Sequence, residues 1–181
     1  MNILETKLAG VKILEPRRFG DERGFFMESY NRAVFDEMAG TPVCFVQDNH
    51  SRSSKGVLRG LHYQAAPRAQ GKLGRVLQGA VLDVVVDIRR ASPHFGHWFS
   101  VVLTAENQRQ LWIPAGFAHG FYVLSDVADY FYKTTEYYSP SHERSVRWND
   151  ADLAIDWQLS GEPILSEKDR SAPRFDSAEY L

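Results

Sequence analysis

The sequence has only one cysteine in 181 residues, so the chain cannot form an internal disulfide. It also lacks a cationic start followed by an apolar block, the pattern of a secretory signal, and acidic Glu5 lies among its first residues. Both features favour a reducing compartment, and we expect a cytoplasmic protein. The cysteine, Cys44, lies in the apolar stretch Val43–Val46 without a cationic neighbour, so we expect a small buried hydrophobe rather than a reactive thiol.

Long apolar runs and charge of one sign are missing as well. The longest apolar run, Gly79–Val86, is interrupted by Asp83 and is far shorter than the roughly 20 residues of a membrane span. Lys and Arg number 21 against 23 Asp and Glu, a net charge of -2, and no block of five or six like charges occurs. These features exclude a general nucleic-acid or anionic-membrane binder. With 44% hydrophobic and 24% charged residues, the composition is typical of a soluble globular protein.

Short runs rich in aromatic and β-branched residues predict six strands. Turn-prone residues separate these runs at the roughly 8–12-residue spacing typical of an antiparallel sandwich or barrel. The sequence therefore predicts a mainly all-β fold, a jelly-roll β-barrel with a few short peripheral helices. The six runs are Leu73–Leu77, Val81–Ile88, Trp98–Thr104, Gln110–Ile113, Gly120–Leu124 and Ala128–Tyr137.

One helix stands out between a possible N-cap, Asn31, and a glycine stop, Gly40, with Val34, Phe35 and Met38 on one face. After Tyr138 the pattern weakens, and we expect this tail to drape over the barrel. Without a repeat, linker or low-complexity stretch, residues 1–181 are expected to form a single domain.

Polar residues interrupt the otherwise apolar strand Val57–Gln64. Alternation along a strand places His62 and Gln64 on one face, and Leu61 and Tyr63 on the other. If the His62 face lines the interior of the barrel, its imidazole can be tuned for proton transfer near neutral pH. The alternative is an ordinary surface or core histidine.

Two further features favour a reactive site. Lys72 opens the next strand, and a lysine can supply positive charge to an oxyanion formed during catalysis. Residues 113–120 are predicted to form a turn that brings a second histidine, His119, to the mouth of a strand pair. The aromatic residues between Gln110 and Tyr138 are mostly core residues, but those at the mouth of a barrel would suit a flat ligand ring.

A metal centre is the competing interpretation of two histidines in a small β-barrel. Metal-binding cupins use a His-x-His pair followed by a glutamate, and a third histidine on another strand. Here Gln64 takes the second position, no glutamate follows for many residues, and two histidines fall short of the three ligands of a catalytic zinc. We therefore expect no metal. The histidines assigned instead to solvated loops are His94, His97 and His142.

Seven motifs follow one another along nearly the whole chain: Phe19–Phe26, Phe45–Ser51, Val57–His62, Gln70–Lys72, Gln110–Pro114, Gly116–Gly120 and Trp148–Asp150. In order and spacing they resemble the dTDP-4-dehydrorhamnose 3,5-epimerase family. The resemblance implies a metal-free, cupin-type jelly roll that needs no cofactor and forms a homodimer. It also implies conversion of dTDP-4-dehydro-6-deoxy-D-glucose to dTDP-4-dehydro-L-rhamnose, a step in the formation of dTDP-L-rhamnose. Two departures from the family pattern, Gly74-Arg75 and His142, remove none of the catalytic groups.

The resemblance also implies roles for individual residues. His62 corresponds to the base that removes a proton next to the C4 ketone, and Asp169 to the carboxylate that orients it. Tyr132 corresponds to the acid that returns a proton from the opposite face, and Lys72 to the cation beside the C4 oxygen.

Substrate contacts follow from the same resemblance. Arg23 and Arg59 match arginines that neutralise the diphosphate, for which the planar guanidinium is well suited. Exchange of the N-terminal segment within a dimer would place Arg23 and Glu28 in the neighbouring subunit's site. Gln47, Asn49 and His119 match polar contacts to phosphate or sugar. The positions that match more peripheral nucleotide or site positions are Glu28, Glu143 and Lys168.

Three alternatives stay open beside the double epimerase. The first is an epimerase that inverts only C3 or only C5 of a related dTDP-4-keto-sugar. The second is a metal-dependent cupin oxygenase, which Gln64 disfavours. The third is a sugar-nucleotide binding module that carries out no proton transfer.

Overall fold

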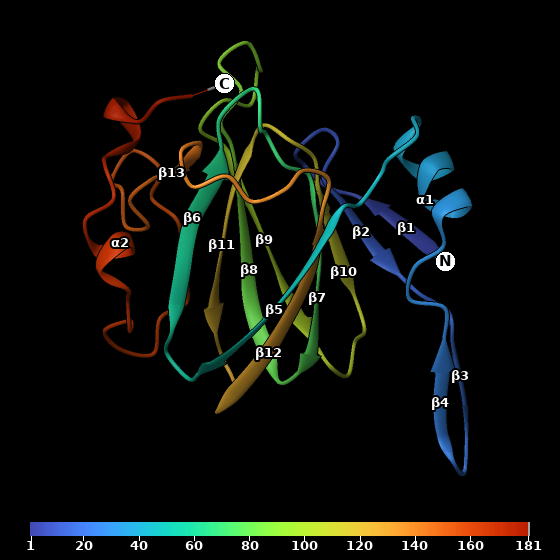
Figure 1. Cartoon of the computed structure of the whole chain (residues 1–181). Helices are drawn as coiled ribbons and strands as arrows, with labels where there is room; N and C mark the ends of the chain where they lie inside the picture. Colours follow the sequence, from blue (N-terminus) through green and yellow to red (C-terminus); the bar gives the residue numbers. More distant parts are fainter. Residues whose placement is uncertain (181) are drawn as a thin grey trace.

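The computed structural model describes residues 1–180, in which two antiparallel β-sheets pack face to face (Figure 1). This arrangement confirms the predicted all-β class. The six-stranded sheet has the order β1 (Asn2–Glu5), β2 (Lys12–Glu15), β10 (Gln110–Ile113), β7 (Lys72–Gln78), β12 (Val127–Thr134) and β5 (Gln47–Ser54). The five-stranded sheet has the order β13 (Glu143–Ser145), β6 (Leu58–Gln64), β11 (Phe117–Val123), β8 (Ala80–Asp87) and β9 (Trp98–Thr104).

All six predicted strands are present, and β9 and β10 have the predicted bounds. The other four are shifted by one residue at most of their ends, and two of them differ by three residues at one end. β11 begins at Phe117 instead of Gly120, because the turn before it is confined to residues 114–116. β12 ends at Thr134 instead of Tyr137, where the chain leaves the sheet in a bend.

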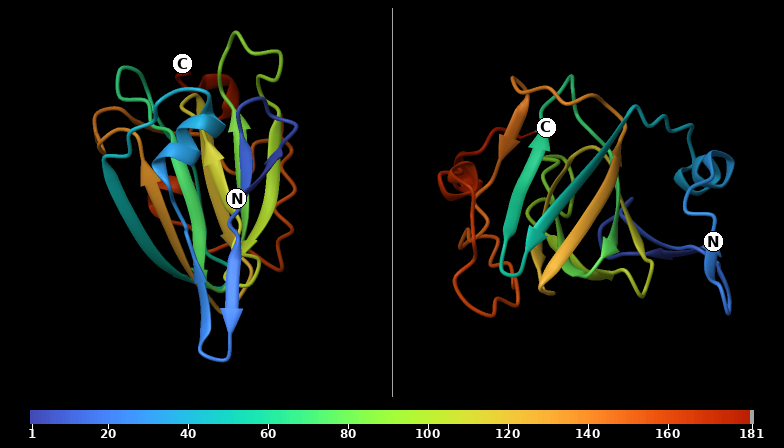
Figure 2. Two further views of the ribbon diagram at one scale, coloured as in Figure 1. Left: turned by 90° about the vertical axis from the view of Figure 1, so that its right-hand side faces the viewer. Right: turned by 60° about the horizontal axis from the view of Figure 1, so that its bottom comes forward.

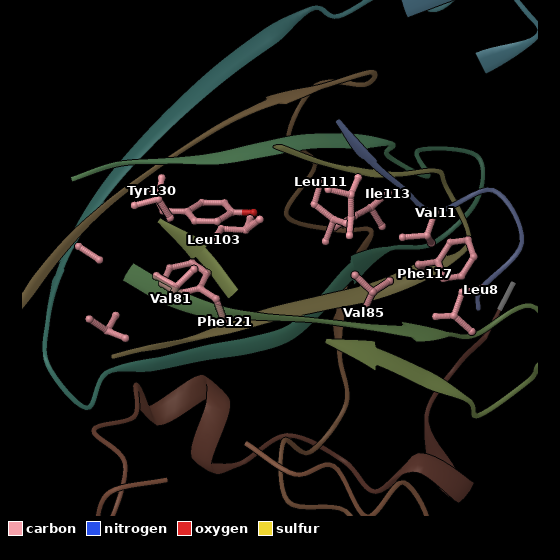
Figure 3. Packing of buried hydrophobic residues seen from close by; sticks show 14 residues of the cluster. Leu8, Val11, Val81, Val85, Leu103, Leu111, Ile113, Phe117, Phe121 and Tyr130 are labelled. Carbon is pink, nitrogen blue, oxygen red and sulfur yellow. The ribbon is translucent and has the colours of Figure 1, made fainter. Parts of the chain in front are cut away.

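The space between the two sheets is filled by apolar side chains that share one face of each strand (Figure 3). Val81 and Val85 of β8, and Phe117 and Phe121 of β11, are spaced four residues apart and therefore point the same way. Tyr130 of β12 faces them from the other sheet and stacks on Phe121 with ring centroids 4.7 Å apart. This core fixes the position of one sheet relative to the other, and the shape of the cavity between them depends on that packing.

The chain after β13 covers the outer face of the five-stranded sheet (Figure 1). Its residues Leu153, Trp157 and Ala178 are buried against that sheet, in a cluster that includes Leu61 and Tyr63 of β6. The expected draping of the tail is confirmed. It includes one short helix, α2 (Glu167–Arg170), and a 3-10 turn at Phe175–Ser177.

The predicted helix is α1 (Arg32–Ala39). The Asn31 side chain accepts hydrogen bonds from two first-turn N–H groups, and Gly40 ends the helix in the left-handed conformation with φ 71°. Phe35 and Met38 are buried in a cluster with Trp112 on the outer face of the six-stranded sheet, as expected, whereas Val34 is only half-buried and lies outside this cluster. Within residues 1–180, no helix is long and apolar enough to cross a membrane.

The expectation for Cys44 is wrong, because its side chain is exposed. The neighbours Val43 and Phe45 pack toward the cluster beneath α1. In an extended segment the residue between two inward side chains points outward, and this geometry leaves the thiol in solvent.

A separate hairpin, β3 (Arg18–Asp21) and β4 (Gly24–Met27), projects away from both sheets (Figures 1 and 2). Its aromatic residues Phe19, Phe25 and Phe26 are 51%, 52% and 70% exposed. An arm with three exposed phenylalanines is unusual for a free surface and is typical of a segment that contacts another molecule.

Candidate active site

A cavity of about 610 Å³ opens between the two sheets and is closed on one side by the tail. Its polar groups come from β5, β6, β7, β11, β12 and β13, and from the segment around α2. The sequence-predicted residues that line it together are Arg59, His62, Lys72, His119, Tyr132, Glu143, Lys168 and Asp169.

His62 and Asp169 form the central pair of this cavity. The His62 Nε2 atom lies 2.5 Å from Asp169 Oδ1, although the two residues are 107 positions apart in the chain. Burial lowers the pKa of His62, while the hydrogen bond and charge of Asp169 act to raise it. Because Asp169 fixes the protonated ring nitrogen, the other nitrogen is left to accept a proton. The alternation prediction is also confirmed, since Leu61 and Tyr63 pack on the opposite face of β6.

Gln64 has a structural function. Its amide donates to the carbonyl oxygens of Arg68 and Tyr137 at 2.6 and 3.2 Å, and its oxygen accepts from the Ser139 N–H at 2.7 Å. The side chain therefore ties the loop after β12 to β6. Across residues 1–180, no cluster of three or more His, Cys, Asp or Glu side chains could hold a metal ion.

His119 lines the cavity, but it is not in a turn as expected. It lies within β11, paired in register with His62 on β6, because the turn ends three residues earlier. The His119 Nε2 atom is 2.9 Å from Asp83 Oδ1, and the Tyr130 hydroxyl donates to Asp83 Oδ2 at 2.6 Å. This buried network fixes the His119 ring at the cavity wall.

Lys72 and Tyr132 face the same cavity from the six-stranded sheet. Burial lowers the pKa of Lys72 to about 8, although the charges of Asp83 and Glu143 act to raise it. Its Nζ atom lies 3.4 Å from the His62 carbonyl oxygen. Burial also raises the pKa of Tyr132, so its phenol carries its proton at neutral pH. The cavity thus holds a base, a cation and a protonated phenol.

The charged groups that line the cavity beside the central pair are held by an ion pair and by hydrogen bonds. Lys168 Nζ lies 2.7 Å from Glu143 Oε1, and the Tyr138 hydroxyl donates to Glu143 Oε2 at 3.0 Å. The Arg59 side chain donates through Nε to Ser53 Oγ at 3.0 Å. The charges that we expect to contact substrate are therefore held in place by neighbours.

Gln47 and Asn49 lie beside the cavity rather than in its lining. Both are half-buried on β5, and the Gln47 amide donates to Asn49 Oδ1 at 2.9 Å. Ser51, two residues further on the same face of the strand, does line the cavity. The pair therefore extends the same wall outward.

Arg23 and Glu28 are not brought to the cavity within one chain. Arg23 lies near the tip of the hairpin, where its exposed guanidinium pairs with Asp21 at 2.5 Å. Glu28 follows β4 and is exposed. The three loop histidines, His94, His97 and His142, lie in loops as expected.

Sequence reasoning missed three groups of the site: Asp83, Tyr130 and Ser166. A lone aspartate within the apolar run Gly79–Val86 was a usable signal for a buried, bonded carboxylate. Tyr130 is one of many aromatics in its run, and nothing local distinguishes it. Ser166 precedes Asp169 by three positions, a spacing that indicates a helix start.

Together, the two packed sheets and the acid–base groups between them define a cupin-like jelly-roll protein with a proton-transfer site. The family model described as dTDP-4-dehydrorhamnose 3,5-epimerase matches residues 5–177. The chain belongs to this family and is an epimerase.

Relatives and solved structures agree over nearly the full length. The Pseudomonas aeruginosa dTDP-4-dehydrorhamnose 3,5-epimerase is 60% identical, over 96% of this chain and 97% of its own. The Shigella flexneri enzyme of the same name is 57% identical, over 100% and 99%. The Legionella pneumophila epimerase, solved in complex with dTDP-4-keto-L-rhamnose, has a TM-score of 0.94 and 55% identity, covering 97% of this chain and 93% of that one.

Proposed function

We propose that this chain inverts C3 and C5 of dTDP-4-dehydro-6-deoxy-D-glucose to give dTDP-4-dehydro-L-rhamnose, in the biosynthesis of dTDP-L-rhamnose. The observation that carries the proposal is the His62–Asp169 pair, which shares one cavity with Lys72 and Tyr132. The Legionella pneumophila complex supports the substrate class, because that enzyme is 55% identical and holds a dTDP-4-keto-sugar.

The chemistry follows from the C4 ketone, which acidifies the C–H bonds at both neighbouring carbons. His62 takes the proton, and the C–H electron pair moves into an enolate with negative charge on the C4 oxygen. The Lys72 ammonium stabilises that oxyanion, and a pre-placed charge of this kind contributes about 3 kcal/mol. The Tyr132 hydroxyl then protonates the same carbon from the opposite face, which inverts it. The phenolate regains a proton and His62 releases one, so the site is restored.

The nucleotide diphosphate requires positive charge at the mouth of the barrel. Arg59 and Lys168 provide it from within the chain. We assign Gln47, Asn49, His119 and Glu143 to polar contacts with sugar or phosphate. Arg23 and Glu28 belong to the same set only if the hairpin reaches a second copy of the chain. We therefore propose a homodimer of one-domain subunits that exchange this hairpin.

A second candidate is an epimerase that inverts a single carbon. The Streptomyces bikiniensis 3'-monoepimerase, solved with dTDP-quinovose, has a TM-score of 0.91 and 36% identity, covering 95% of this chain and 87% of that one. Because this monoepimerase has the same fold as the present chain, the fold alone does not distinguish inversion of one carbon from inversion of two. The higher identity to the double epimerases favours inversion at both carbons.

The test is deuterium wash-in. The protein is incubated with dTDP-4-dehydro-6-deoxy-D-glucose in heavy water, and the C3 and C5 proton signals are followed by NMR. Exchange at both carbons with formation of the L-sugar is the expected result. Exchange at one carbon would establish the single-centre epimerase, and exchange at neither would overturn the proposed activity.

Two variants assign the base and the acid. His62→Asn and Tyr132→Phe should each lower kcat by roughly 10²–10⁴-fold, because each removes one proton-transfer group. The matched controls are His97→Asn and Tyr137→Phe, an exposed histidine and an exposed tyrosine outside the cavity. If a control variant lost as much kcat as the cavity variant with which it is matched, the assignment would be contradicted.

A further inference from the structure

Ser166 closes the hydrogen-bond chain that begins at His62. Its hydroxyl donates to Asp169 Oδ2 at 2.7 Å, while Asp169 Oδ1 lies 2.5 Å from His62 Nε2. The Asp169 backbone N–H in turn donates to Ser166 Oγ at 3.2 Å. Both carboxylate oxygens of Asp169 are therefore engaged by side chains, one by the base and one by Ser166, and the Gly60 backbone N–H also bonds this carboxylate.

The sequence around α2 has the spacing of a helix capping box, but its carboxylate is used differently. In a capping box, the N-cap serine bonds the N–H of the third helical residue, whose acidic side chain bonds back to the N-cap backbone. Ser166 makes the first of these bonds. The Asp169 carboxylate instead accepts from the Ser166 hydroxyl and points its other oxygen at His62. The N-cap serine is therefore hydrogen-bonded, through the Asp169 carboxylate, to the base His62.

The chain on either side of this turn is anchored independently of Ser166. Ile164 pairs with the start of β6, through Leu58 N–H to Ile164 oxygen at 3.0 Å and Ile164 N–H to Gly56 oxygen at 2.8 Å. Beyond the helix, the Arg147 N–H donates to the Pro173 oxygen at 2.8 Å. These anchors place the turn near His62. They leave the rotation of the Asp169 carboxylate to its own partners.

A single helical turn cannot hold a side chain rigidly by itself. Without the Ser166 hydroxyl, Asp169 Oδ2 loses its side-chain donor and the Asp169 N–H loses its acceptor. Besides His62, only the backbone N–H of Gly60 would then still bond the carboxylate. A buried carboxylate with an unmet oxygen rotates toward another donor, since leaving it unpaired is costly. Asp169 is only 2% exposed, so the orientation of its carboxylate depends on the few donors packed around it.

We propose that Ser166 is a positioning residue for the epimerase reaction, which locks the Asp169 carboxylate in the orientation that presents Oδ1 to His62. This inference rests on the proposed role of His62 as the base. It extends that role to a three-residue relay in which Ser166 acts through Asp169.

The first measurement is independent of activity. The pKa of His62 is determined by NMR titration of its ring signals in the wild type, Ser166→Ala and Ser166→Thr. Asp169 raises the His62 pKa through its hydrogen bond and charge, so a carboxylate that has rotated away must leave that pKa lower. We expect a lower His62 pKa in Ser166→Ala and a nearly wild-type one in Ser166→Thr, whose hydroxyl is retained. Ser166 is exposed, so the added methyl group has room.

The second measurement is kinetic. Ser166→Ala should lower kcat by about 10- to 100-fold, the size found when a group that orients an active ligand is removed, with KM changed less than about twofold. Ser166→Gly lacks the hydroxyl but remains a good N-cap, so it reports on the hydroxyl even if the alanine variant folds poorly. Ser171→Ala is the matched control, because Ser171 lies at the other end of α2 and its hydroxyl bonds the Glu167 and Lys168 carbonyls.

An unchanged or higher His62 pKa in Ser166→Ala and Ser166→Gly would overturn the proposal, as would an equal effect of Ser171→Ala. If the wild type failed to exchange deuterium, the proposed function would fall, but the NMR titration would still decide whether Ser166 positions Asp169. The two failures are therefore distinguishable.

Discussion

Lys72 and Asp83 show how single buried residues set the chemistry of the cavity. Burial lowers the pKa of Lys72 to about 8, close enough to neutral pH for its charge to depend on its neighbours. The strongest opposing influence is the negative charge of Asp83, which is fully buried and bonded to His119 and Tyr130. Asp83 therefore has two functions: it orients His119 and it helps to keep Lys72 protonated.

This balance predicts the pH dependence of kcat/KM. The oxyanion needs the charged form of Lys72, which exists below its pKa, so activity should decline as pH rises through about 8. Asp83→Asn removes the negative charge and lowers the Lys72 pKa, so the decline should begin at lower pH. A shift of one unit would cost about tenfold in activity on the alkaline side.

The measurement is the pH profile of kcat/KM for wild type and Asp83→Asn. The matched control is Asp126→Asn, because the Asp126 side chain is 97% exposed and pairs only loosely with Lys55. An alkaline limb that stays in place, or that moves to higher pH in Asp83→Asn, would disprove the electrostatic role of Asp83.

At the same scale, His62 could be predicted from the sequence and its partner could not. A titratable ring that interrupts an apolar strand is visible in a window of eight residues. The contact with Asp169 spans 107 positions, so no local pattern selects that acid among 23. Within the sequence, only the resemblance to a known family points to Asp169.

Among the elements, strands rich in aromatic and β-branched residues were predictable, and short or polar strands were not. β8 is buried along nearly its whole length, and its apolar run is obvious. β5 lies at the edge of the six-stranded sheet with alternately half-buried and exposed polar residues, so it has no hydrophobic signal. β1 to β4 have four residues each, too few for a period of two to be recognised.

Gly74 shows what packing between elements requires of a strand. It lies in β7, and a Cβ atom there would come 2.0 Å from the Tyr130 hydroxyl oxygen. The glycine therefore makes room for the Tyr130 side chain, which crosses from β12 to bond Asp83. Gly74 therefore supports the network behind His119, although it does not line the cavity itself.

We predict that Gly74→Ala lowers the free energy of unfolding by about 1–3 kcal/mol, because the added methyl group overpacks the core and displaces Tyr130. The midpoint of denaturant unfolding measures the loss. Gly161→Ala is the control, since a methyl group added there would meet no heavy atom within 4 Å and no change is expected. Equal midpoints for the two variants would show that Tyr130 moves aside without cost.

At the scale of the whole molecule, the hairpin of β3 and β4 is the feature that one chain leaves unexplained. It extends away from the barrel (Figure 1) and exposes three phenylalanines. Its Arg23 does not line the cavity of its own chain, where a diphosphate needs positive charge. A second copy of the chain accounts for both facts at once. It would cover the aromatic surface, and its own cavity would receive the arginine.

This arrangement predicts complementation between two inactive variants. In His62→Asn the base is lost but the hairpin is intact, whereas in Arg23→Ala the base is intact but the hairpin lacks its guanidinium. If the hairpin serves the neighbouring subunit, a mixed dimer contains one site with an intact His62 and an intact Arg23. Unfolding and refolding an equal mixture should then restore about one quarter of wild-type activity, since half the dimers are mixed and each has one complete site. If Arg23 served its own chain, every site in the mixture would lack one group and no activity would return. Full activity of Arg23→Ala alone would instead show that the hairpin arginine is not needed in either subunit.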